Sequence, residues 1–231
     1  MLPVNPAKPT SVDVSANWAS ERTLSPLEQA YNFILESILS GELAPGMRIP
    51  TEAVAERLGI SRMPVRDALR RLEGDGAITI YANRGATVAE YSKDEVIQLV
   101  EMRAVLEGLG ARLAISNVTQ RELEEIRHLQ SRMDRSADDL SQWIVHHDAF
   151  HNYITSLSGR PLLTRQTKKM RLMLRPYFRE HHAANQELEI PGFEHQRIVD
   201  VLIGGQPDEV EQEVRNHGIA NVGKVTKLMD R

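Results

Sequence analysis

Four histidines in the second half of the chain occupy positions whose side chains would face the inside of a helical bundle. His147 and His151 are four residues apart, so their rings lie about 40° apart around one helix and can address a single point. His195 and His217 each fall in line with the apolar residues of a later helix. A lone histidine of this kind is most often a hydrogen-bonded core residue, whereas four on three helices predict a nitrogen-rich site for zinc, nickel or a similar divalent ion.

An arginine also falls on an inward position. Arg103 lies on the apolar face of a helix predicted over residues 93 to 115. Because a buried guanidinium without an anion is strongly unfavourable, either a structural carboxylate such as Glu101 or Glu107 or an incoming anionic ligand must compensate its charge. Both alternatives stay open at the level of the sequence.

The N-terminal part of the chain is locally cationic, although the whole chain has a net charge of -4. Arg62 and Arg66 lie near the start of a predicted helix, at the end that enters the major groove in helix-turn-helix proteins. Arg84 and Gly85 lie at the tip of a predicted hairpin, from which an arginine can reach the minor groove or the DNA backbone. The alternative is that these arginines only keep exposed helix faces soluble.

Helix and strand boundaries can be predicted from the sequence in the first third of the chain. Proline-rich residues 1 to 22 are expected to form a mobile tail. Ser25 and Pro26 predict a helix start, and Gly41 its end, while a second helix runs from Thr51 to Leu58. A third helix follows within three residues, capped by Ser61, and strands are expected over 77–81 and 86–89. This order predicts a winged helix-turn-helix with a small β-hairpin wing over residues 23–91.

The rest of the chain reads as helices only, which predicts an antiparallel all-α bundle over residues 92–231 and a mainly α protein. Hydrophobic residues make up 41% and charged residues 26%, and there is no cysteine, so thiol chemistry and disulfides are excluded. No apolar run is long enough for a membrane helix, so we expect a cytoplasmic protein with no membrane partner. The helix starts are expected near Ser92, Thr119, Ala137, Arg160, Leu188 and Pro207.

Residues 24 to 91 closely resemble the winged helix of the GntR family of bacterial transcription regulators. The resemblance rests on the runs GELAPGMRIP (41–50) and AERLGISRMPVRDALRRLE (55–73), together with Glu52 and Gly76. It implies that operator DNA is contacted from the recognition helix and from the wing. At Ala53 the sequence departs from relatives that carry an arginine there. The implied DNA-binding residues are Ser61, Arg62, Arg66, Arg84 and Gly85.

Residues 92 to 230 resemble the FCD (FadR C-terminal domain) branch of that family, through EMRAVLE (101–107), Phe150-His151, Pro161-Leu-Leu, EHQRIV (194–199) and His217. Metal-binding members hold a divalent cation with three histidines and one aspartate. Here His151, His195 and His217 match, but His147 stands at the aspartate position, with Asp148 as the alternative fourth ligand. An imidazole there would favour zinc or nickel over harder ions. The resemblance further implies that Arg103, and second Arg175 on a helix over 162–181, bind a small carboxylate effector.

These observations predict a DNA-binding transcription regulator that is not an enzyme. We expect a homodimeric repressor that binds a palindromic double-stranded operator and responds to a small organic acid, a metal ion or both. A metal-dependent hydrolase is the first alternative, because His147 and His151 superficially match a zinc protease motif, although Asp148 stands where the general base glutamate would be. A structural DNA-binding protein without an effector is the second.

Overall fold

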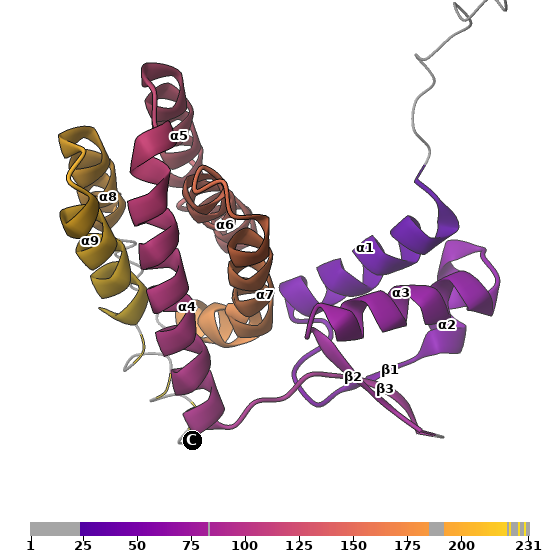
Figure 1. Cartoon of the computed structure of the whole chain (residues 1–231). Helices are drawn as coiled ribbons and strands as arrows, with labels where there is room; N and C mark the ends of the chain where they lie inside the picture. Colours follow the sequence, from indigo (N-terminus) through magenta and orange to yellow (C-terminus); the bar gives the residue numbers. More distant parts are fainter. Residues whose placement is uncertain are drawn as a thin grey trace, which may run out of the picture.

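The computed structural model describes residues 24–82, 84–184 and 192–220, and residues 222, 226 and 229 near the C-terminus. The tail expected over residues 1–22 and the helix start expected near Leu188 lie outside the described residues. The described chain forms a winged helix-turn-helix domain followed by a helical domain (Figure 1). None of the described helices is long and apolar enough to cross a membrane.

The N-terminal domain has three helices and a small antiparallel sheet. Its elements are α1 (Pro26–Ser40), β1 (Arg48–Ile49), α2 (Thr51–Leu58), α3 (Arg62–Gly74), β2 (Ile78–Tyr81) and β3 (Gly85–Val88). Gly59 ends α2 with a φ of 64°, as its position in the sequence predicts. Ser25 caps α1 through a capping box with Glu28. Ser61 precedes α3 but makes no capping hydrogen bond, which corrects its assignment as a side-chain cap.

The sheet has three strands rather than the two of the expected hairpin. β1 pairs with β3, and β3 pairs with β2, so β3 lies in the middle. Ile49 of β1 is buried against the domain core, while Arg48 is exposed. Two residues show too little alternation to predict a strand from the sequence. The β2–β3 hairpin projects from the domain on the side of α2 and of the start of α3 (Figure 1).

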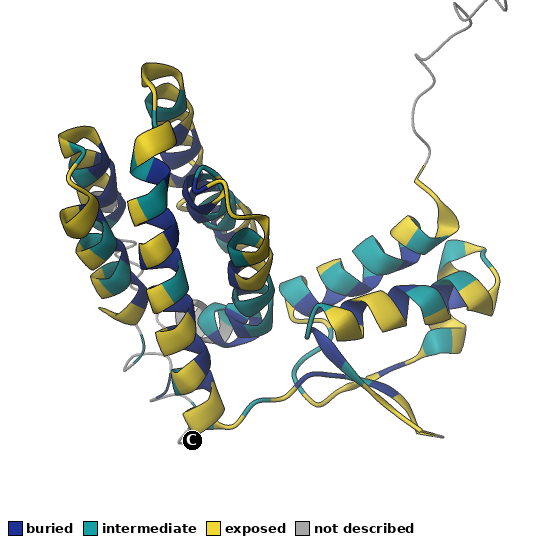
Figure 2. Cartoon of the chain, viewed as in Figure 1, coloured by how far each residue is buried: buried dark blue, intermediate teal, exposed yellow. Residues whose placement is uncertain are grey.

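The helical domain buries one face of each helix in a common interior (Figure 2). α4 begins after Ser92, which forms a capping box with Glu95. The helix expected to start near Ala137 begins at Leu140 instead, because the carboxylate of Asp139 accepts the backbone N–H of Gln142 and caps it there. The elements are α4 (Lys93–Ala114), η1 (Ile115–Asn117), α5 (Gln120–Asp134), α6 (Leu140–Ser156), α7 (Pro161–Ala184), α8 (Gly192–Gly204) and α9 (Pro207–Ala220).

The helix α7 joins the two domains. It packs against α4 and α6 on one side, and α1 of the winged helix lies on its other side (Figure 1). Leu172 packs against the apolar core of the N-terminal domain. The hydroxyl of Tyr177 accepts the backbone N–H of Tyr91 at 2.6 Å, at the connection between the domains. A single helix therefore contacts both the interior of the helical domain and the winged helix.

Candidate functional site

The residues expected to contact DNA are all exposed. Ser61, Arg62 and Arg66 lie on the first two turns of α3 or just before it, and Arg84 and Gly85 lie at the hairpin. Arg62 forms a salt bridge of 3.3 Å with Glu52 of α2, and both side chains are about two-thirds exposed. Such a solvated pair contributes little to stability.

Sequence reasoning missed one arginine of this surface. Arg48 of β1 is exposed, and its guanidinium lies 3.5 Å from the place a Cβ would occupy at Gly85. Gly85 has a φ of 86°, a conformation that L side chains rarely adopt. Arg48 therefore lies beside the wing, where it extends the cationic surface. The sequence held no signal for this, because the strand that carries Arg48 is only two residues long.

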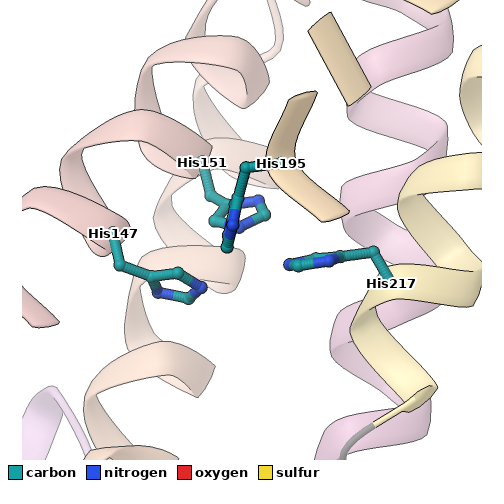
Figure 3. A group of neighbouring side chains, drawn as sticks. All are labelled: His147, His151, His195 and His217. Atoms are coloured by element: carbon teal, nitrogen blue, oxygen red, sulfur yellow. The ribbon is translucent and has the colours of Figure 1, made fainter. Parts of the chain in front are cut away.

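The four histidines singled out in the sequence come together between α6, α8 and α9 (Figure 3). One potential ligand nitrogen from each ring lies within 4.8 Å of those of the other three. Ring centroids are 4.6 Å apart for His147 and His151 and 4.5 Å apart for His195 and His217. We call His147, His151, His195 and His217 the histidine cluster. Its members come from three helices, so only the tertiary fold brings them to one point.

Carboxylates lie behind two of these rings. Asp148 Oδ1 is 3.6 Å from Nδ1 of His147, and Glu194 Oε2 is 3.6 Å from Nδ1 of His217. A carboxylate at one ring nitrogen fixes the orientation of an imidazole and leaves its other nitrogen for a metal. This arrangement is typical of the partners behind metal-binding histidines.

Burial keeps three of the four histidines, His147, His151 and His217, neutral. Burial, followed by the charges of His147, Arg171 and Arg103, lowers the pKa of His217 to about 3. Burial is also the main cause of the lowered pKa values of His147 and His151. Neutral imidazole is the form that binds metal ions. The protonation states thus suit a metal site near neutral pH.

The carboxylate of Asp148 is bound by two arginines rather than directed into the histidine cluster. It forms salt bridges with Arg175 and, at 3.5 Å, with Arg171. Burial alone would raise the pKa of Asp148, but the contact with His147 and the charges of Arg175 and Arg171 outweigh it and keep the carboxylate ionised. The structure places His147, not Asp148, among the four converging side chains. Asp148 lies behind His147 as a charged neighbour.

Arg103 is buried, as its position in the sequence predicts, and its closest carboxylate is Glu107 rather than the exposed Glu101. The separation from Arg103 Nε to Glu107 Oε1 is 3.9 Å, which is too long for a hydrogen bond. Glu107 is instead bound closely by Arg171, at 2.6 Å. The guanidinium of Arg103 lies over the ring of Phe178, 5.1 Å from its centroid. Arg103 is therefore incompletely compensated.

Among the described residues, the arginines beside the histidine cluster outnumber the carboxylates that pair with them. Three arginines, Arg103, Arg171 and Arg175, share the two carboxylates Glu107 and Asp148. Sequence reasoning named Arg103 and Arg175 and missed Arg171, although Arg171 lies one helical turn before Arg175 and so on the same face. A buried excess of positive charge favours the binding of an anion. The charges of Arg103 and Arg171 also help to lower the pKa values of His147 and His217.

The donor set of the histidine cluster fits a divalent ion. Zinc–nitrogen bonds of about 2.0–2.1 Å place tetrahedral ligand nitrogens about 3.4 Å apart, so nitrogens within 4.8 Å need to move inward only slightly. Nε2 of the buried His151 has no hydrogen-bond partner among the described residues. Such an atom is costly unless something binds it. The residues present therefore match a metal ion in number, type and protonation.

Two family models match the chain. Residues 26–88 match "Bacterial regulatory proteins, gntR family", and residues 98–220 match "FCD domain". The second match covers more than half of the 231 residues. The two matched segments coincide with the winged helix and the helical domain of the structure.

Individual relatives are transcription regulators. The chain is 29% identical over 150 residues to the HTH-type transcriptional regulator McbR of Escherichia coli, which covers 64% of this chain and 68% of McbR. It is 22% identical to the transcriptional repressor GlaR of the same species over 90% of this chain and 98% of GlaR. The solved structure of E. coli McbR superposes with a TM-score of 0.75 at 25% identity, covering 87% of this chain and 98% of that one. These proteins are regulators and not enzymes, which leaves the hydrolase alternative without support.

Proposed function

Because the chain belongs to the GntR family of bacterial transcription regulators and carries an FCD domain, we propose that it is a repressor whose operator affinity is set by a divalent metal ion and a small carboxylate in the helical domain. The observation that carries this proposal is the histidine cluster beside a buried excess of arginine charge. Repression is supported by relatives named as repressors, such as GlaR and RspR of E. coli.

The metal is proposed to bind His147, His151, His195 and His217, and zinc or nickel suits four imidazoles best. Elemental analysis of protein purified without an affinity tag tests this. We expect about one ion per chain, in line with a single four-ligand site, and its loss in the variants His195→Ala and His217→Ala. His128→Ala is the matched control, because His128 is exposed on α5 and lies outside the cluster. A metal-free wild-type protein that takes up neither zinc, nickel nor manganese would refute the site.

The effector is proposed to be a small carboxylate that binds beside the metal and is paired with Arg103. Arg171 and Arg175 already have close carboxylate partners, whereas the one carboxylate near Arg103 in the described part of the chain is Glu107 at 3.9 Å. Arg103 thus keeps donors for a bidentate contact with an incoming carboxylate. This ranks Arg103 above Arg175 as the effector-binding residue.

A panel of mono- and dicarboxylates, such as acetate, succinate and citrate, tests the effector. We expect a carboxylate that releases the wild-type protein from DNA to have no effect on Arg103→Ala, while DNA affinity without the acid is retained. Arg127→Ala, an exposed substitution on α5, should respond like the wild type. If Arg103→Ala loses DNA affinity in the absence of any acid, the role of Arg103 is structural.

A homodimer is proposed because two-fold symmetry matches the two half-sites of a palindromic operator. The exposed face of α4 supports it. Met102, Val105 and Leu109 are 46%, 44% and 38% exposed and follow each other at intervals of three and four residues, which makes one apolar stripe. A second copy presents the same stripe and would cover it. Sedimentation velocity should find dimers of the wild type and monomers of Val105→Glu, with Ile203→Glu, exposed on α8, as the control that remains dimeric.

A further inference from the structure

A hollow of about 750 Å³ lies between the two domains, away from the histidine cluster. One wall is the winged helix, with Tyr31 of α1 and Arg71 and Asp75 at the end of α3. The other wall is the turn after α6 and the first three turns of α7, from Ser156 to Leu172. We call this hollow the interdomain groove. A molecule of metabolite size fits a volume of this kind.

The lining of the interdomain groove is strongly cationic. It has five cationic side chains and a single carboxylate, in a chain whose net charge is -4. That carboxylate, Asp75, accepts a hydrogen bond of 2.8 Å from the hydroxyl of Tyr31. A concave surface lined by one sign of charge concentrates ions of the opposite sign. The five cations are Arg71, Arg160, Arg165, Lys168 and Lys169.

The cations of the α7 wall lack internal partners. Arg160, Arg165, Lys168 and Lys169 form no salt bridge with a carboxylate in the part of the chain that the structure describes.

We propose that the interdomain groove binds a polyanion with two or more phosphate groups, and that this ligand bridges the two domains. Phosphate suits the site because several separate cations surround one volume, whereas a single carboxylate would engage only one or two of them. The bound polyanion would join Arg71 of the winged helix to the cations of α7. It would therefore stabilise the one arrangement of the domains in which both walls face each other. This site is independent of the histidine cluster and of its proposed metal.

Calorimetric titration with inorganic tripolyphosphate tests the proposal. The metal-free full-length protein is used in excess EDTA, so that the probe cannot act by removing metal. We expect binding to the wild type and a loss of about tenfold or more in affinity for Arg165→Ala/Lys168→Ala, since each contact with a charged partner contributes about tenfold. Arg127→Ala/Arg132→Ala, which removes the same charge from exposed positions of α5, should bind like the wild type. Equal affinity of both double variants overturns the proposal.

The phosphate groups in the groove could also belong to the DNA backbone rather than to a small ligand. The same variants distinguish these two sources of phosphate. We expect Arg165→Ala/Lys168→Ala to bind a short random-sequence DNA duplex as the wild type does, because the groove lies at the end of α3 opposite to Arg62 and Arg66. Weakened duplex binding by this variant, with no binding of tripolyphosphate to the wild type, would assign the groove to the DNA backbone and refute a small ligand. Circular dichroism and the thermal midpoint of each variant confirm that the fold is intact.

Discussion

Arg66 is the exposed arginine at the start of α3 that has no salt bridge among the described residues, whereas Arg62 is held by Glu52. An arginine that contacts a base edge contributes about 1–3 kcal/mol to specific binding. We therefore predict that Arg66→Ala weakens binding of a duplex selected by the wild-type protein by about tenfold or more. Electrophoretic mobility shifts measure this, and Arg127→Ala controls for the loss of one positive charge. An unchanged affinity would remove Arg66 from the interface.

Tyr31 gives a prediction about alkaline stability. Burial and then the hydrogen bond to Asp75 raise its pKa from 10.0 to about 12. The folded state therefore keeps the phenol protonated, so the stabilisation is fully present below pH 10 and is lost as the pH rises toward about 12. We predict that the difference in urea midpoint between wild type and Tyr31→Phe shrinks across this interval. A difference that stays constant from pH 8 to 12 would show that Tyr31 does not titrate as described.

At the scale of the element, α7 has two functional faces. Arg171 and Arg175 point toward the buried carboxylates of the helical domain. The neighbouring Leu172 packs on the winged-helix core, and Met173 lies 3.0 Å from the place a Cβ would take at Gly76. A ligand that shifts Arg171 and Arg175 would also shift Leu172 and Met173, because a helix moves as one body.

We predict that Leu172→Ala/Met173→Ala uncouples the winged helix from metal binding in the helical domain. In the wild type, adding zinc to metal-free protein should slow amide hydrogen exchange in α1 and α3 as well as in the helical domain. The double variant should show the slowing in the helical domain alone, because the truncated side chains no longer transmit the change. Leu162→Ala, exposed at the start of α7, serves as the control. Equal slowing of α1 and α3 in the double variant would mean that the domains communicate by another path.

For the whole molecule, the histidine cluster connects α6 with α8 and α9, from which it is separated in the sequence by the whole of α7. A metal that binds only the folded state stabilises it by about 4 kcal/mol at a thousand times its dissociation constant. For a domain of this size that corresponds to about 8–16 °C in Tm. We predict that a chelator lowers the Tm of the wild type by about this amount, because it removes the metal. The same chelator should leave the Tm of His217→Ala unchanged, and differential scanning calorimetry measures both. A chelator that leaves the wild-type Tm unchanged would contradict a stabilising metal.

Most of the element order, and the inward positions of the four histidines and Arg103, can be read from the amino-acid sequence. These follow from local causes: the caps Ser25 and Ser92, the left-handed Gly59, and the spacing of apolar residues along each helix. The strand at Arg48 escaped detection because two residues carry no periodicity, and the start of α6 shifted because Asp139 caps it.

Which charged groups meet depends on how the helices pack against one another. Asp148 and His147 are adjacent in sequence, yet Asp148 faces Arg171 and Arg175, while His147 joins His151 of its own helix and two histidines of later helices. The ion pair between Arg171 of α7 and Glu107 of α4 likewise depends on how these two helices pack. The interdomain groove depends on how two separate domains pack. Spacing within a helix fixes a direction around that helix, but the distance between helices is set by side chains that pack from all sides.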